Sequence, residues 1–145
     1  QKIRSLGLAV KLDTNGFRPE VLKRLCEQSL SIMPLWISSG LGKLWPGLRR
    51  TGNQPCSYRR KRCLSASGAV PFEFRTTVVR ELHSEEDFID IAQWINGCSS
   101  YFLQSYQDSE NVLTPGFSAC SKEELLHYLD IVRPCAKTVK LRGVD

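Results

Sequence analysis

Four polar residues stand at or near the ends of predicted strands, where they could bind a charged ligand. Asp13 and Thr14 directly follow an apolar, strand-like run, Gln104 ends a second run, and Arg75 lies within a third. Ligands of parallel α/β proteins gather at the carboxyl ends of the strands. The sequence therefore predicts a polar rim that contains Asp13, Thr14, Arg75 and Gln104.

Two interpretations are open for each charged member of this rim. Asp13 could offer its carboxylate to a cation or to the amine of a ligand, or it could be a turn aspartate that bonds its own backbone. Arg75 is flanked by Phe74 and Thr76, and guanidinium groups are seldom buried without a partner. It could bind an anionic group of a ligand, or form a structural ion pair with Glu73 or Asp13.

The histidines and cysteines give no catalytic or metal-binding pattern. His83 falls in a predicted loop and His127 on an amphipathic helix, where we expect it at the surface. The six cysteines include no Cys-x-x-Cys pair and no correctly spaced histidine. The chain also has no phosphate-binding glycine loop and no nucleophile elbow. We therefore assign no catalytic residue and no metal ligand in this chain, and expect reduced thiols.

The elements that must position the rim alternate between strand and helix. Apolar and β-branched runs predict the strands, which cover residues 8–12, 72–79, 101–104 and 139–141. Helical periodicity and capping residues predict the helices, which begin at Pro19, after Ser84 and after Ser121, the last two with Asp87 and Glu124 as partners in capping boxes. This alternation is typical of a parallel α/β sheet or barrel.

Composition sets broad limits on the class of protein. The 145 residues are 41% hydrophobic, which is enough for an ordinary core. No run of about 18 apolar residues and no signal-peptide pattern is present, so we expect a cytoplasmic protein without a membrane partner.

One internal segment differs from the rest of the chain. Residues 28–72 contain no Asp or Glu, whereas their seven Lys and Arg residues exceed the whole net charge of +5. Tyr58 interleaves with Arg59, Arg60 and Arg62, so residues 49–62 could form a nucleic-acid-binding module. A single aromatic residue is poor for stacking on bases, which makes a nucleic-acid partner the weaker alternative.

Four stretches of the sequence resemble the radical S-adenosylmethionine (SAM) activating enzymes. These stretches are VKLDTNGFRPEVLKRL, VPFEFRTTVVRELHSEEDF, YFLQSY and LRG, within residues 8–30 and 69–143. They are most similar to the activating proteins of anaerobic ribonucleoside-triphosphate reductase, which are related to the pyruvate formate-lyase activating enzymes. The resemblance implies an incomplete parallel (β/α) barrel, in which a [4Fe–4S] cluster cleaves SAM to make a glycyl radical on the reductase.

The resemblance also implies roles for three residues and two partners. Asp13 matches the aspartate of the LDTNG motif, which helps to hold the methionyl end of SAM with a monovalent cation, and Thr14 adjoins it. Arg75 matches an arginine expected to pair with the carboxylate of SAM, a role that suits a bidentate guanidinium. The implied partners are the glycyl-radical subunit of the reductase and an electron donor such as flavodoxin.

Three departures from the family pattern place the activity of this chain in question. The CxxxCxxC motif that binds the cluster and the Gly-Gly-Glu segment that holds the methionyl amine are not in the sequence. Both belong before residue 8 in the family, so we expect a carboxyl-terminal fragment that does not generate radicals by itself. A folded pseudoenzyme that still docks on the reductase is a further alternative.

The third departure is the sequence MPLWISS, which stands where the family has a strand with an Asp-x-Lys pattern. Shifting the reading frame by two bases forces Ala between Met33 and Pro34 and Asp between Trp36 and Ile37, and permits Ala-Leu-Val-Asp-Ile-Lys. Our hypothesis is a frame shift near Leu30 that is reversed between residues 65 and 68. We expect residues 31–68 to lack ordered structure; the alternative is a real basic insert or loop.

Overall fold

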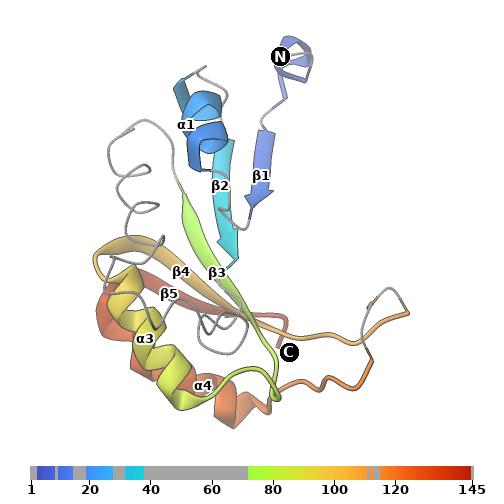
Figure 1. Cartoon of the computed structure of the whole chain (residues 1–145), viewed down its shortest axis with the longest axis vertical. Helices are drawn as coiled ribbons and strands as arrows, with labels where there is room; N and C mark the ends of the chain where they lie inside the picture. The colour runs from blue at the N-terminus through green and yellow to red at the C-terminus, as the bar shows by residue number, and fades with distance from the viewer. Residues whose placement is uncertain are drawn as a thin grey trace.

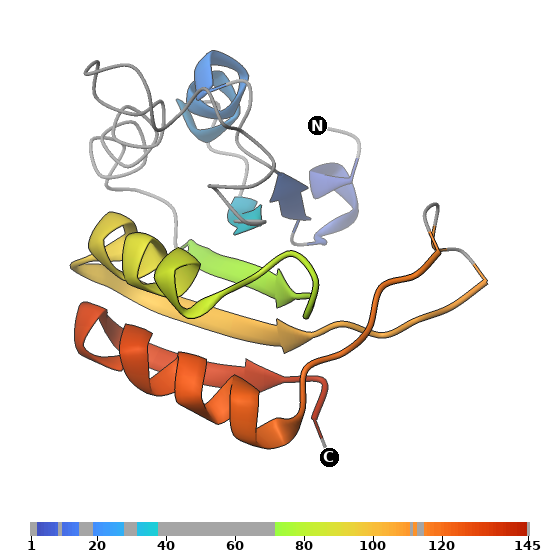
Figure 2. The same ribbon diagram turned by 60° about the horizontal axis from the view of Figure 1, so that its bottom comes forward.

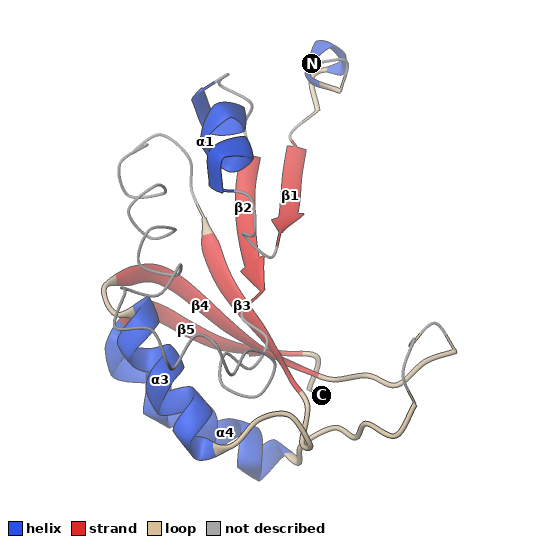
Figure 3. Ribbon diagram, viewed as in Figure 1, coloured by secondary structure: helices blue, strands red, loops and turns tan. Residues whose placement is uncertain are grey.

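The computed structural model describes residues 3–8, 10–14, 19–27, 32–37, 72–110, 112 and 115–144. Five strands and three α-helices follow one another in the described part of the chain (Figures 1 and 3). The strands are β1 (Val10–Thr14), β2 (Ile32–Ile37), β3 (Glu73–Val78), β4 (Cys98–Ser105) and β5 (Ala136–Arg142). The helices are α1 (Pro19–Glu27), α3 (Glu85–Ile95) and α4 (Lys122–Val132), with short 3₁₀ turns η1 (Arg4–Leu6) and η3 (Arg133–Cys135).

The five strands form one sheet in the order β1-β2-β3-β4-β5, and every neighbouring pair is parallel. Strand order that follows chain order is typical of a (β/α) barrel, whereas doubly wound sheets reverse direction at a switch point. Helices α3 and α4 lie side by side along one face of β3, β4 and β5 (Figure 2). The predicted fold class, part of a parallel (β/α) barrel, is confirmed.

The core lies between these two helices and the sheet. On α3, Phe88, Ile91 and Ile95 recur at helical spacing and are fully buried, as the apolar periodicity predicts. They pack with Phe74 of β3 and Tyr101 of β4. The Tyr101 hydroxyl donates a 2.7 Å hydrogen bond to Thr76 Oγ1, which satisfies two buried polar groups at once.

Both predicted capping boxes are present. The Ser84 amide donates to Asp87 Oδ2 at 2.9 Å, and the Ser121 amide donates to Glu124 Oε2 at 2.7 Å. The Glu124 amide donates in return to Ser121 Oγ. Gly97, which lies just after the first of these helices, has a φ of +79°, a conformation that glycine adopts without steric cost. Local sequence therefore determines where α3 and α4 begin and where α3 ends.

The structure corrects several predicted boundaries. The first strand covers Val10–Thr14 rather than residues 8–12, because its pairing with β2 continues to Thr14. Asp13 and Thr14 are therefore the last residues of β1 and not a turn. The strand predicted at 101–104 begins at Cys98, and the one predicted at 139–141 begins at Ala136, because these two strands pair from that position onward.

The largest correction concerns MPLWISS. Residues 32–37, within the segment expected to lack order, form β2 and pair in parallel with both β1 and β3. A central strand of a parallel sheet needs an apolar run and no alternation, and Ile-Met-Pro-Leu-Trp-Ile supplies one. Pro34 removes one backbone donor from this ladder. The remaining residues of the segment, 38–68, lie outside the described residues, and so do the cluster at 49–62 and the proposed frame-shift limits.

Candidate functional site

One face of the sheet, turned away from α3 and α4, gathers charged side chains; we term it the site face. Along β3, Phe74, Thr76 and Val78 are fully buried on the helix side, so Glu73 and Arg75 point to the site face. Strand register places further residues on the same face, namely Lys11 and Asp13 of β1, Thr77 of β3, Phe102 and Gln104 of β4, and Lys140 and Arg142 of β5.

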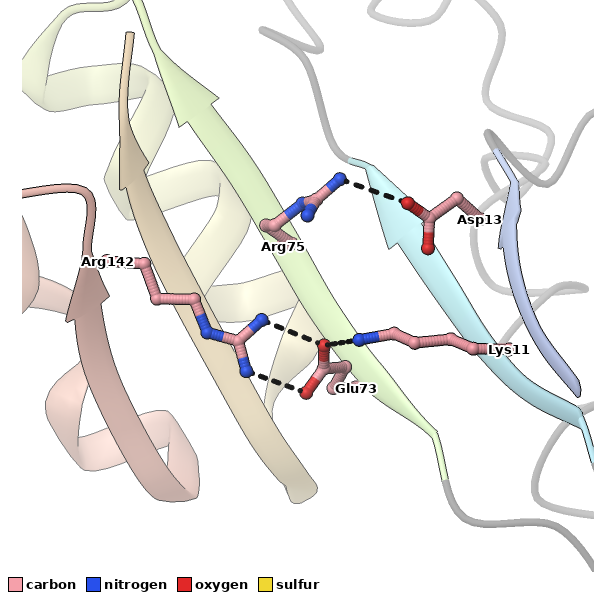
Figure 4. A network of polar contacts seen from close by, with 5 residues as sticks. All are labelled: Lys11, Asp13, Glu73, Arg75 and Arg142. Carbon is pink, nitrogen blue, oxygen red and sulfur yellow. Dashed lines mark hydrogen bonds and ion pairs between the residues drawn. The ribbon is translucent and has the colours of Figure 1, made fainter. Parts of the chain in front are cut away.

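The predicted pair Asp13 and Arg75 meets on this face. Arg75 Nη2 donates to Asp13 Oδ2 at 3.5 Å (Figure 4). The Arg75 side chain is 19% exposed and that of Asp13 is 53% exposed. At 3.5 Å the hydrogen bond is long and therefore weak. Of the two alternatives for Arg75, the structure contains the ion pair with Asp13.

Arg75 has donor capacity that this ion pair does not use. Its Nε atom is buried and has no hydrogen-bond partner among the described residues. A guanidinium carries five N–H donors in a planar fork that matches a carboxylate. A second anionic group could therefore be held by Arg75 beside Asp13.

Glu73 is the centre of a second, tighter set of contacts on the site face (Figure 4). Its Oε1 accepts from Lys11 Nζ at 3.0 Å and from Arg142 Nη1 at 3.1 Å, and its Oε2 accepts from Arg142 Nη2 at 3.2 Å. The Glu73 side chain is only 7% exposed. Burial raises the pKa of this carboxyl, but the hydrogen bonds and charges of Arg142 and Lys11 outweigh burial and lower the pKa below its ordinary value.

The carboxyl-terminal part of the site face is polar. Gln104 is aligned with Thr77 on one side and with Arg142 on the other, so a hydroxyl, an amide and a guanidinium stand in one row across three strands. The Arg142 guanidinium lies 3.5 Å from the centre of the Phe102 ring, a cation–π contact that helps to fix its position. The rim residue Gln104 thus belongs to the same face as Asp13 and Arg75.

Thr14 differs from the other predicted rim residues. It is the last residue of β1, aligned with Trp36. Side chains alternate along a strand, so Thr14 points to the same side as the partly buried Leu12, which packs against the helix-side core. The structure brings Asp13, Arg75 and Gln104 to one face and leaves the Thr14 side chain on the other.

The two histidines lie away from the site face. His127 is exposed, as predicted, and its Nε2 lies 3.1 Å from Glu85 Oε2 on the outer side of the helices. His83 is buried, and its Nδ1 lies 3.1 Å from both the amide nitrogen and the carbonyl oxygen of Val79. An imidazole nitrogen within hydrogen-bond distance of backbone groups is held in place as a structural group.

Among the described residues, Cys98, Cys120 and Cys135 form no disulfide bond. Burial raises the pKa of the Cys120 thiol, and the charge of Glu124 adds to this effect, so the thiol stays protonated at neutral pH. Within the described ranges, no three His, Cys, Asp or Glu side chains are close enough to hold a metal ion.

Sequence reasoning missed Lys11 and Arg142, and it named Glu73 only as a possible partner of Arg75, whereas the structure pairs Glu73 with Lys11 and Arg142. A signal was available in the spacing, because Lys11 and Asp13, like Glu73 and Arg75, are two residues apart and therefore share a face of a strand. Only strand order could show that Arg142 joins them.

Comparison with known proteins finds similarity both in sequence and in structure. No protein-family model matches the chain. It is 30% identical over 108 residues, 72% of its length, to a protein of Methanocaldococcus jannaschii whose name gives it a proposed role as a glycyl-radical enzyme activating enzyme. The chain covers 45% of that relative, so it spans less than half of the relative's length.

One structural match is to a radical SAM methyltransferase from Sphaerobacter thermophilus. It has a TM-score of 0.70 at 15% identity and covers 94% of this chain and 42% of the methyltransferase. At this identity the match shows the fold alone: the described strands and helices share the partial (β/α) barrel of that protein. Among the described helices, none has the length and apolar character needed to span a bilayer.

Proposed function

We propose that this chain is part of a radical SAM enzyme that activates a glycyl-radical enzyme, and that its site face holds the methionyl end of SAM. The sequence likeness and the structural likeness both support the radical SAM superfamily. The observation that carries the proposal is the Asp13–Arg75 pair on the site face of a parallel sheet whose strand order follows chain order.

The chemistry of this pair matches the methionyl group. That group is a zwitterion, with one carboxylate and one ammonium on the same carbon. The Arg75 guanidinium would donate to the carboxylate, and the Asp13 carboxylate would accept from the ammonium or share a monovalent cation with it. The long contact between Arg75 and Asp13 costs little to replace, and the buried Nε of Arg75 would gain a partner.

The charge balance of the site face also suits this ligand. Its described strand residues include four cations, Lys11, Arg75, Lys140 and Arg142, and two anions, Asp13 and Glu73. Glu73 is engaged with Lys11 and Arg142, which leaves Arg75 and Lys140. Of these two, Arg75 contacts Asp13 and is therefore placed to meet a carboxylate beside it.

The described residues do not fit a [4Fe–4S] cluster. Cys98, Cys120 and Cys135 gather into no ligand group in the described ranges, and burial favours the protonated thiol of Cys120. We therefore derive no reaction step through a cluster and assign to this chain's residues the binding and orientation of SAM. Bound SAM would supply the radical chemistry of the whole enzyme.

The identity of the partner is part of the proposal. The LDTNG and EFRTTVV motifs, at residues 12–16 and 73–79, resemble those of the activating proteins of anaerobic ribonucleoside-triphosphate reductase. We propose the glycyl-radical subunit of such a reductase as the partner of the complete enzyme, with flavodoxin as its electron donor.

The test is calorimetric titration of SAM into the 145-residue chain and its R75Q variant. A hydrogen-bonded pair of charges contributes about 1.5–3 kcal/mol, so R75Q should weaken SAM binding about 10- to 150-fold. E85Q, which changes an exposed carboxylate on the other side of the sheet, serves as the matched control. Absence of SAM binding by the unmodified chain would refute the proposal, and equal affinity of R75Q would refute the role of Arg75.

A further inference from the structure

We infer that Glu73 is a positioning residue, whose buried carboxylate ties both outer strands of the sheet to β3 and so sets the separation of Asp13 and Arg75. Its role for a ligand rests on the proposed function, whereas its effect on the strands does not. The motif EFRTTVV begins at Glu73, but neither the resemblance nor the relatives' names give this residue a positioning role.

The placement of the three residues is the first observation. Glu73 lies on β3, the central strand, while Lys11 lies on β1 and Arg142 on β5, the two outermost strands of the described sheet. Each contact crosses an intervening strand, β2 on one side and β4 on the other. Strands two apart are about 9–10 Å from each other in a flat sheet, so long side chains must reach inward over the site face from both edges.

The second observation is the strength of the contacts at the centre. The carboxylate is almost fully buried and accepts three charge-assisted hydrogen bonds of 3.0–3.2 Å, two of them from the fork of Arg142. The Arg142 guanidinium also stacks on the Phe102 ring, 3.5 Å from its centre. By contrast, the Asp13–Arg75 contact is single, 3.5 Å long and half exposed on the Asp13 side. The tight network can therefore position the loose pair, and not the reverse.

The third observation is adjacency along the strands. Lys11 and Asp13 are successive residues on the site face of β1, and Glu73 and Arg75 are successive residues on the site face of β3. The Lys11–Glu73 link and the Asp13–Arg75 pair thus span the same two strands one step apart. A fixed Lys11–Glu73 distance limits how far Asp13 can move from Arg75, and with it the space left for a ligand between them.

Hydrogen exchange on the full chain tests the effect on the strands. E73Q keeps the size of the side chain and removes its charge, so we expect the amides of β1 and β5 to exchange about tenfold faster or more, with α3 and α4 unchanged. K11M removes only the contact between β1 and Glu73. Amide exchange should therefore become faster in β1 and stay unchanged in β5. E85Q, which neutralises an exposed carboxylate on α3, is the control. Equal acceleration in α3 and α4, or no acceleration in β1, would overturn the inference.

A double-mutant cycle tests the effect on the site. E73Q should weaken SAM binding about tenfold in the unmodified chain and less than about twofold in an R75K background, because Glu73 acts through the position of the Asp13–Arg75 pair. Equal weakening in both backgrounds would show a general effect and overturn the positioning role. If the unmodified chain binds no SAM, the proposed function fails, and hydrogen exchange still decides whether Glu73 holds the outer strands.

Discussion

The described side chains in the two halves of the chain make different kinds of contact. From β3 onward, strands and helices enclose a core in which Phe74, Phe88, Tyr101 and Leu125 are almost completely buried. From η1 to α1, Leu12 is a partly buried contributor to that core, and Leu6 and Leu8 are exposed. Beyond the β2 ladder, β1 is joined to β3 by two ion pairs, Lys11–Glu73 and Asp13–Arg75.

This difference explains how the candidate site is built. Arg75 and Glu73 stand on β3, beside the apolar core, whereas Asp13 and Lys11 stand on β1, whose described side-chain contacts with β3 are ion pairs. Hydrophobic burial is the dominant favourable term in folding, while partly exposed ion pairs contribute little. Asp13 is therefore held less firmly than Arg75. A zwitterion bound between the two side chains would hold both in place.

The largest expected effect comes from the core of the second half. F88A removes a fully buried ring that stacks on Tyr128 at 4.3 Å, and such a change costs about 3–5 kcal/mol of unfolding free energy. I89A, at the exposed neighbouring position on α3, should change it by less than about 0.5 kcal/mol. Denaturant unfolding followed by circular dichroism measures both. A small effect of F88A would contradict a core centred on α3.

A smaller effect is expected where the two halves meet, at Glu73. Breaking a buried ion pair costs about 3–5 kcal/mol, but Lys11 and Arg142 are 48% and 38% exposed, so we expect E73Q to cost about 1–3 kcal/mol at pH 7. The pKa of Glu73 is lowered in the folded state. Its contribution is therefore complete above the ordinary carboxyl pKa of about 4.3 and is lost as the pH falls through the lower folded value.

Denaturant unfolding of the unmodified chain and of E73Q between pH 7 and pH 3 tests this sign. The difference in unfolding free energy between the two proteins should be constant near neutrality and should shrink below about pH 4.3. A difference that grew toward acid would show that burial, rather than the charges of Lys11 and Arg142, governs Glu73.

A third prediction concerns the capping residue at the start of α4, in the second half of the chain. S121A removes the side chain that accepts from the Glu124 amide at the start of α4, which should cost about 1 kcal/mol. S109A, in the exposed loop before α4, where the backbone amide and not the side chain makes the contact with Asp108, should be neutral. Equal unfolding free energies for the two variants would mean that tertiary packing alone fixes the start of α4.

The same division separates what the sequence could and could not predict. The capping residues and helical periodicity predicted α3 and α4, since these signals act within one turn of helix. The sequence also predicted Asp13 and Arg75 as members of one rim. It did not predict that residues 32–37 would form β2, because an aperiodic apolar run acquires its strand conformation from the ladders of β1 and β3. The Lys11–Glu73–Arg142 network depends on strand order, which no local pattern specifies.

The smallest effect is expected on the outer surface of the second half. His127 Nε2 lies 3.1 Å from Glu85 Oε2, and both side chains are more than half exposed, at 57% and 58%. Such pairs contribute about 0–0.5 kcal/mol, so H127A should leave both the unfolding free energy and the calorimetric affinity for SAM almost unchanged. Because His127 is one of only two histidines and lies across the sheet from Arg75, this variant separates the two faces. A marked loss of SAM binding in H127A, with folding intact, would place the functional surface on the helices and not on the site face.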